Sequence, residues 1–227
     1  MADKLQNLKA LKGGLYKRWV LINEKDYQRV CDYLQKINFS IDDFNYEIKH
    51  IENSQIKEFV FLIMLTVWIQ EAAKSLECCY RKDVLEDFAF AKEDELNKAS
   101  KYINALRSFV VAHPLSTNRH EKYGFDGDLI CVDIRTNGRY LSLQKDEMFF
   151  HLNLEGISKE RCENDDYFLY VYSKKEDDMQ FFRYIGCCLD DVVLVANLYI
   201  EKIYALDSYI SRQKKRNFET RVKNEQT

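Results

Sequence analysis

The stretch Phe59–Ile69, which reads FVFLIMLTVWI, decides how this chain folds. Its side chains leave no polar face over about three helical turns, and a helix that is apolar all round lies in the centre of a fold. As an uninterrupted apolar run it is too short to span a bilayer. The sequence therefore predicts a central helix over about 53–81, with other helices packed around it as a bundle.

The segments on either side of this stretch supply the other helices. The chain has no glycine between Leu15 and Tyr123, and its only proline is Pro114, a composition that favours long helices. Ser40 followed by Asp43 resembles a capping box and predicts a helix start in this region. The further helices are expected over about 24–37, 41–51, 92–113 and 189–212, each with apolar residues at helical spacing.

Beyond Pro114 glycines appear and short alternating runs replace the helical spacing. Ile130, Val132 and Ile134 alternate with other side chains, as in a half-buried strand. Asn137-Gly138 is a strong signal for a two-residue hairpin turn leading into 140–144. Further strands are expected over 148–154, 167–173 and 179–184.

The expected fold class is therefore mainly α, a helical bundle with a small β-hairpin or β-sheet insertion (α+β). Residues 1–123 and 186–227 would form the bundle, and residues 124–185 the β-rich insertion.

Composition and charge limit the class of protein. The 227 residues are 46% hydrophobic, which is enough for a globular domain with a large core. Because 34 basic and 37 acidic residues give a net charge of −3, a nucleic-acid site must be a local patch. Seven cysteines without a C-x-x-C fit neither a disulfide framework nor a zinc ribbon. With no signal peptide at its start, the chain is expected to be cytoplasmic and not bound to a membrane.

One pair of residues suggests chemistry, near the end of the helix expected over 92–113. Arg107 and His113 enclose five residues. This pattern resembles the R-x(4–6)-H signature of HEPN domains, helical bundles that often dimerise and in which two such motifs form a metal-independent ribonuclease site. The resemblance implies catalytic roles for Arg107 and His113, supporting roles for Asn104 and Ser108, and no cofactor. Ser108 stands where the family commonly has Asn, Asp or His.

The chemistry of the pair is compatible with RNA cleavage by attack of a 2′-OH. On an ideal α-helix, side chains six residues apart differ by 600°, equivalent to 240°, so Arg107 and His113 of one chain do not share a face. A homodimer can bring Arg107 of one subunit to His113 of the other. The imidazole can accept the 2′-OH proton, and the guanidinium can stabilise the charge of the transition state.

The resemblance therefore implies an endoribonuclease, a hydrolase of toxin or defence type, with RNA as its substrate and a possible protein partner or activator. The segment after the motif mixes basic, aromatic and amide groups that suit contacts with RNA. The expected RNA-binding residues are Asn118, Arg119, His120 and Lys122. As a plain alternative, this segment is a polar connection between a helix and a strand.

Other interpretations stay open. His113 at a helix end and Arg107 beside the apolar stripe can have purely structural roles, and the protein can be a non-catalytic helical adaptor or a regulatory protein that binds RNA or protein. A zinc site of His113, His120 and Cys131 lacks a fourth ligand and matches no usual spacing, so no metal is expected. The adjacent pairs Cys78-Cys79 and Cys187-Cys188 are interpreted as small core residues.

Overall fold

The protein is described here from a computed structural model. Backbone and side chains are both described for most of the helices and strands. For residues 112, 129–136, 171–174, 180–182 and 214–224 only the backbone is described. The described residues are 8–11, 26–51, 56–80, 85–112, 129–136, 141, 143–174 and 180–224.

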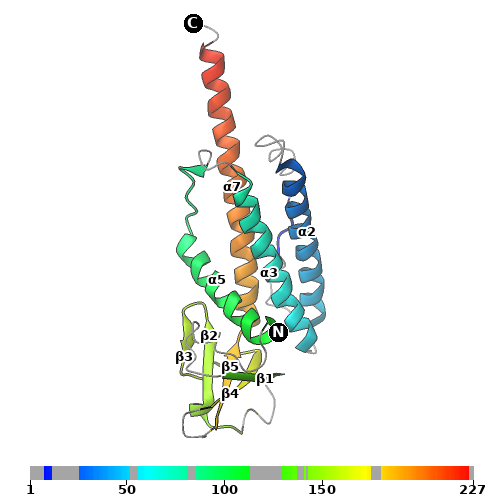
Figure 1. Ribbon diagram of the computed structural model, residues 1–227, viewed down its shortest axis with the longest axis vertical. Helices are drawn as coiled ribbons and strands as arrows, with labels where there is room; N and C mark the ends of the chain where they lie inside the picture. Colours follow the sequence, from blue (N-terminus) through cyan, green and yellow to red (C-terminus); the bar gives the residue numbers. More distant parts are fainter. Residues whose placement is uncertain are drawn as a thin grey trace.

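Over the described residues, the helical part consists of four α-helices. They are α2 (Tyr27–His50), α3 (Ile56–Cys78), α5 (Glu93–Arg107) and α7 (Leu189–Asn224). Helix α3 contacts each of the other three, as Figure 1 also shows. The mainly α fold with a small β part is confirmed, and so is the central position of the apolar helix.

Helix α3 is longer than the apolar run from which it was predicted. At 23 residues it is, within the described residues, the one helix whose length and composition would suffice to cross a membrane. Most of that length is buried inside the protein, and the buried side chains include Phe59, Leu65 and Ile69. A core helix in a bundle has the same composition, and α3 has the environment of a core helix.

Helix α2 corrects the prediction of two shorter helices that meet at Ser40. The chain is one continuous α-helix from Tyr27 to His50. Ser40 is buried in its middle, and its hydroxyl has no hydrogen-bond partner in the described ranges. The apolar stripe continues across this position from Ile37 to Ile41 and Phe44, all of them fully buried. Burial of this stripe outweighs the local capping signal, because tertiary packing supplies most of the stability of a helix.

The strands form one mixed sheet at the lower end of the bundle in Figure 1. Within the described residues the sheet has five strands in the order β1-β4-β5-β2-β3. Strands β2 and β5 are parallel, and the other neighbours are antiparallel. The strands are β1 (Leu129–Thr136), β2 (Phe149–Asn153), β3 (Gly156–Ser158), β4 (Tyr167–Lys174) and β5 (Gln180–Cys187).

The predicted hairpin between β1 and 140–144 is wrong. Strand β1 pairs instead with β4, antiparallel, from Leu129↔Ser173 to Thr136↔Tyr167. The Asn137-Gly138 turn lies outside the described residues, but Leu141 is not in a strand. Leu141 is buried in a small cluster with three aromatic residues of the sheet. Its side chain thus covers the sheet, and β4, which matches β1 in length, provides the partner strand.

The sheet is joined to the bundle by a shared core. The rings of Phe59 in α3 and Tyr167 in β4 stack with their centroids 3.9 Å apart and an interplanar angle of 9°. Tyr167, Leu169 and Ile185 belong to the same buried cluster as the helices. One surface of β4 and β5 therefore packs on the base of the bundle, so that residues at the junction are held by both parts.

Helix α7 extends well past its predicted end near Arg212, since it continues to Asn224. The apolar pattern stops near Ile210, but no glycine or proline occurs after Gly186 to interrupt the helix. Figure 1 shows the last turns of α7 projecting beyond the other helices. Sequence periodicity detected only the part of the helix that packs on the bundle.

Candidate functional site

Arg107 lies at a change of helix type. Helix α5 ends at this residue, and a π-helix follows over Ser108–Ala112. The backbone N–H of Ser108 donates to the carbonyl oxygens of both Ala105 and Asn104 at this junction. The single α-helix expected over 92–113 is therefore wrong in its last turns. Because π-helices are rare and frequently lie at functional sites, the junction marks Arg107 independently of the sequence motif.

The guanidinium of Arg107 has donors to spare. Its side chain is 43% exposed, and Nη1 lies 3.9 Å from Oε1 of Glu71 in α3. That separation makes an ion pair but exceeds hydrogen-bond distance. The Nε atom of Arg107 is buried and has no hydrogen-bond partner among the described residues. A buried, unpaired N–H costs about 1–3 kcal/mol, so an anionic oxygen that reached this group would remove the cost.

Asn104 and Ser108, the two predicted supporting residues, lie on either side of Arg107 in the sequence. Nδ2 of Asn104 donates to Oγ of Ser100 over 3.5 Å. Asn104 also lines a cavity of about 420 Å³ between α5 and the β2–β3 segment, together with Lys101 and Glu155. Ser108 is buried. Asn104 is thus beside an accessible cavity, whereas Ser108 faces the interior.

A polar network fixes how α5 lies against the other helices. Nε2 of Gln70 donates to Oγ of Ser100 over 2.8 Å and to the hydroxyl of Tyr199 over 2.9 Å. Nζ of Lys74 donates to the same Ser100 oxygen over 3.1 Å. These bonds join α3, α5 and α7. They fix the rotation of α5 about its own axis. They therefore also fix the direction in which the Arg107 side chain extends from α5.

The other residues of the predicted site lie outside the described residues. They are His113, Asn118, Arg119, His120 and Lys122. The π-helix ends at Ala112, directly before His113. The 240° offset calculated between Arg107 and His113 assumed α-helical winding, and it does not apply across five residues of π-helix.

A second group of side chains, which the sequence analysis missed, lies at the junction of sheet and bundle. It contains His151 of β2, Cys162 and Asp165 of the connection before β4, and Cys188 between β5 and α7. One ligand atom from each residue lies within 4.8 Å of all the others. Nδ1 of His151 and Oδ1 of Asp165 are 2.7 Å apart. We call these four residues the junction cluster.

The sheet topology brings the junction cluster together. Parallel pairing of β2 with β5 puts His151 opposite Gly186. A Cβ atom on residue 186 would overlap the carboxylate of Asp165, so only glycine leaves room for this side chain. The next residue, Asp166, accepts a hydrogen bond from the N–H of Leu189 over 2.8 Å. The connection that carries Asp165 is thereby tied to the start of α7.

Burial dominates the electrostatics of this region. It raises the pKa of Asp165, and the nearby His151 opposes that shift. Burial, reinforced by Asp165 and Asp191, raises the pKa of the Cys188 thiol. Burial likewise raises the pKa of Asp191 to about 6. Burial therefore destabilises the anionic forms of these groups. A bound cation would stabilise those anionic forms.

No local signal in the sequence marks the junction cluster. Its residues come from three places along the chain, and only Cys162 and Asp165 are close in sequence. The interpretation of Cys187 as a core residue is confirmed, because Cys187 is buried. Its neighbour Cys188 is only partly buried. The same interpretation is wrong for Cys78, which is exposed. Only the spacing Cys162-x-x-Asp165, set beside the strand residue His151, could have suggested a site.

Fold and sites together define an α+β protein in which a helical bundle stands on a five-stranded mixed sheet. Comparison with protein-family models, with curated proteins and with solved structures finds no match.

Proposed function

We propose that this protein is a metal-independent endoribonuclease of the HEPN type, acting as a toxin or defence component in the cytoplasm. The observation that carries the proposal is the state of Arg107. Its guanidinium is half-exposed at the junction of α5 with a π-helix, and within the part of the chain that the structure describes its buried Nε has no partner. Such a group is suited to bind a phosphate oxygen.

In this proposal each residue has a defined part in the reaction. His113 accepts the proton of a ribose 2′-OH, whose oxygen attacks the adjacent phosphorus and displaces the 5′-oxygen of the next nucleotide. Arg107 stabilises the additional negative charge on the phosphoryl oxygens. The proton taken up by His113 is then given to the departing 5′-oxygen, so the products are a 2′,3′-cyclic phosphate and a 5′-hydroxyl. Asn104 and Ser108 support the arginine, and RNA is held by Asn118, Arg119, His120 and Lys122.

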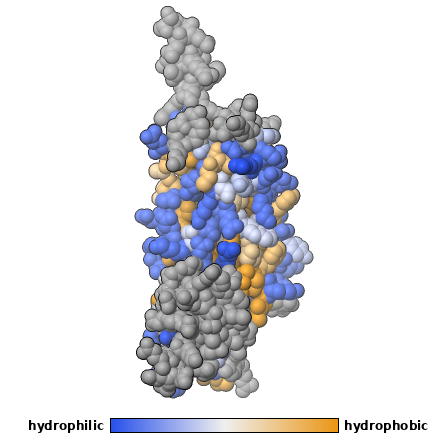
Figure 2. Space-filling view, viewed as in Figure 1, coloured by the Kyte–Doolittle hydropathy of each residue, from blue (hydrophilic) through white to orange (hydrophobic). Residues whose placement is uncertain are grey.

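A homodimer is part of the proposal, and a partly exposed surface of α3 is suited to it. Val60, Met64 and Trp68 recur at intervals of four residues and are each only partly covered. Glu71 continues this surface beside Arg107. Figure 2 shows apolar surface at the lower right of the bundle, where Figure 1 places the first turns of α3. Packing two copies on this surface would bury it and bring the two Arg107 side chains toward one cleft.

The end of α7 suits an RNA ligand. From residue 212 to 224 the helix carries six basic residues and one acidic residue, Glu219, giving 6 − 1 = +5 in a chain with a net charge of −3. This extension projects from the bundle. A local basic helix of this kind attracts phosphates whatever their base sequence.

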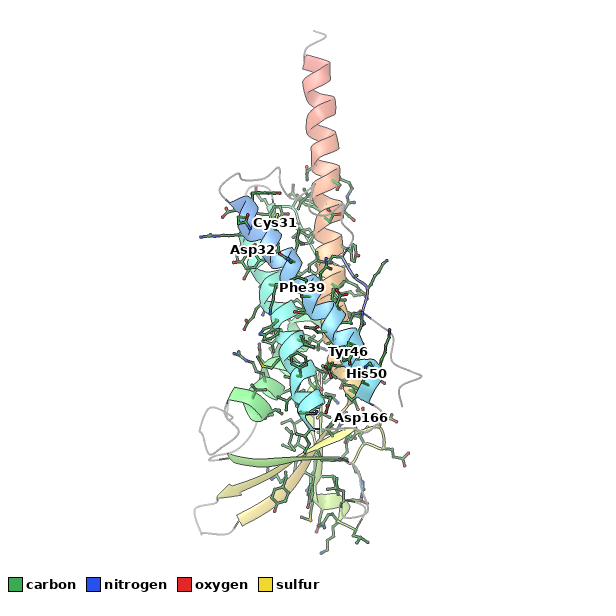
Figure 3. The ribbon with its side chains drawn as sticks, turned by 90° about the vertical axis from the view of Figure 1, so that its right-hand side faces the viewer. Cys31, Asp32, Phe39, Tyr46, His50 and Asp166 are labelled. Atoms are coloured by element: carbon green, nitrogen blue, oxygen red, sulfur yellow. The ribbon has the colours of Figure 1, made fainter. Side chains whose placement is uncertain are left out.

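The second candidate function is that of a non-catalytic adaptor, and the exposed aromatic residues of α2 favour it. Phe39 and Tyr46 are 57% and 61% exposed. They lie seven residues apart, on one face of the helix, as Figure 3 shows. The His50 ring lies 4.2 Å from the ring of Tyr46 and extends the same surface. A partner helix could dock there without any reaction taking place.

Expression in cells together with the natural activator separates the two candidates. The proposal predicts that the parent protein slows growth and degrades total RNA, and that Arg107→Ala abolishes both effects. Arg29→Ala is the matched control, since Arg29 is an exposed arginine paired with Asp26 on α2. If the parent, Arg107→Ala and His113→Ala are expressed equally and have identical effects, the enzyme is rejected. Under the adaptor alternative, Phe39→Ala with Tyr46→Ala is the variant that loses function.

A further inference from the structure

We propose that the junction cluster, His151, Cys162, Asp165 and Cys188, binds one Zn²⁺ ion. Each residue offers one ligand atom, and these four atoms lie within 4.8 Å of one another. Zinc ligands at about 2.0–2.3 Å in a tetrahedron are separated by roughly 3.3–3.8 Å. The longest separations therefore need to close by only about 1 Å, a movement that side-chain rotation can supply.

The donor set selects the kind of metal. One imidazole nitrogen, two cysteine sulfurs and one carboxylate oxygen form a mixed set of the sort that zinc accepts. Calcium and magnesium take oxygen ligands and avoid sulfur, and iron–sulfur clusters are held chiefly by cysteine sulfurs. Because the protein supplies four ligands, no coordination position stays open for a reacting water. The site is therefore structural.

The carboxylate of Asp165 is an independent observation that indicates a ligand. Asp165 is 4% exposed, and its Oδ1 is occupied by His151. The other oxygen, Oδ2, is buried, and no described residue is its hydrogen-bond partner. Leaving a buried carboxylate oxygen unpaired is unfavourable, and a cation in the cluster would complete its coordination. The absence of a side chain at Gly186 keeps room for this carboxylate.

The geometry does not support a catalytic cysteine in the same place. In a Cys-His-Asp triad the imidazole lies between the carboxylate and the thiol. Here Sγ of Cys188 donates to the carbonyl oxygen of Asn164 over 3.2 Å and lies 3.7 Å from Oδ1 of Asp165. The Cys188 thiol thus bonds to the carboxylate side of the pair rather than to the imidazole. Two thiols and a buried His-Asp pair are explained better by metal ligation.

Zinc in the junction cluster would link elements that are distant in sequence. It would join β2, the connection before β4 and the start of α7, at the place where the sheet meets the bundle. Binding requires deprotonated thiols, so it releases protons and strengthens as the pH rises. Because the ion binds the folded state, we expect it to raise the Tm of the protein.

The test uses the full-length reduced protein expressed in zinc-supplemented medium. We expect elemental analysis to give one zinc per chain, and Co²⁺ added to chelator-treated protein to give a thiolate-to-cobalt charge-transfer band. Cys162→Ser and Asp165→Asn should weaken zinc binding by at least tenfold. The matched control is Cys78→Ser, which removes an exposed free cysteine from α3 and should change nothing.

Three results would overturn the proposal. The first is a parent protein that carries no zinc and gives no charge-transfer band with Co²⁺. The second is zinc retained with unchanged affinity in both Cys162→Ser and Asp165→Asn, because the ion would then bind elsewhere. The third is a Cys162–Cys188 disulfide in protein isolated under conditions that preserve the cellular redox state. If a variant fails to fold, the zinc content and Co²⁺ spectrum of the parent decide the question alone.

Discussion

Arg107 and Glu71 form an ion pair that leaves the arginine available. Both side chains are exposed by about half, and the closest oxygen lies 3.9 Å from the guanidinium. Exposed pairs of this kind contribute from nothing to about 1 kcal/mol. A phosphate that replaces Glu71 at Nη1 therefore has little interaction energy to overcome.

Glu71→Gln should consequently increase affinity for RNA. Removing the negative charge leaves Arg107 without a competing carboxylate, and we expect RNA to bind about 2–5-fold more tightly, on the scale of an exposed pair. Fluorescence anisotropy with labelled RNA measures this, in a His113→Ala background that prevents cleavage. Glu147→Gln, which removes an exposed carboxylate paired with Lys145, is the control. Weaker binding by Glu71→Gln would show that Arg107 does not contact RNA.

Gly186 tests how closely the Asp165 carboxylate packs on β5. A methyl group on residue 186 would overlap that carboxylate, so we expect Gly186→Ala to lower the free energy of unfolding by about 1–3 kcal/mol, the usual cost of overpacking. The cost should fall to less than half of this in an Asp165→Ala background, where the overlapping atoms are gone. Urea titrations of the four proteins in the cycle measure the coupling. If Gly186→Ala lowered the free energy of unfolding equally with Asp165 present and in the Asp165→Ala background, the packing of the carboxylate on β5 would be contradicted.

At the scale of elements, Ser40 shows how burial overrides a local signal. A serine in mid-helix has a lower helix propensity than alanine by about 0.5 kcal/mol. In α2 its buried hydroxyl also lacks a partner from any residue that the structure describes. We therefore expect Ser40→Ala to stabilise the protein by about 1 kcal/mol, or a Tm increase of about 2–4 °C.

The control for this prediction is Ser208→Ala, an exposed serine of α7. It should show only the smaller propensity gain. Calorimetry of the three proteins measures the difference. A loss of stability in Ser40→Ala would mean that the hydroxyl marks a true helix start, as the sequence pattern had suggested.

The elements that could be predicted are those whose signal is local and strong. The all-apolar run from Phe59 gives a central helix because no other place in a fold accepts it. The Ser40 signal failed because the stripe through Ile37 and Ile41 is buried without interruption. The hairpin after Asn137-Gly138 failed because β1 takes its partner from distant residues in β4.

The sites depend even more on contacts between distant residues. The motif with Arg107 could be found because its residues are close in sequence, although the π-helix that follows has no recognisable pattern. His151 and Asp165 meet only because β2 pairs in parallel with β5. A parallel pairing is a property of the sheet topology, which periodicity and turn signals do not give.

At the scale of the whole molecule, the account requires two copies. We expect a mass of about twice the 27.1 kDa of one chain by light scattering at micromolar concentration. Met64→Glu places a charge in the middle of the partly exposed surface of α3 and should shift the protein to monomers. Leu194→Glu is the control, because Leu194 is an exposed apolar residue of α7 outside the proposed interface. A parent protein that is monomeric would contradict the dimer.

If Arg107 and His113 cleave RNA without a metal, the termini of the RNA products show it. The assay is run in EDTA, below the melting temperature of the chelator-treated protein, so that loss of a structural zinc does not unfold the enzyme. End-labelling and mass spectrometry identify the new termini.

The account predicts 2′,3′-cyclic phosphate and 5′-hydroxyl ends from the activated parent protein. His113→Ala and Arg107→Ala should each cut about 10²–10⁴-fold more slowly, and the double variant should be little worse than either one. Products with 5′-phosphate ends, or cleavage by the activated parent that EDTA abolishes while the protein stays folded, would contradict the claim.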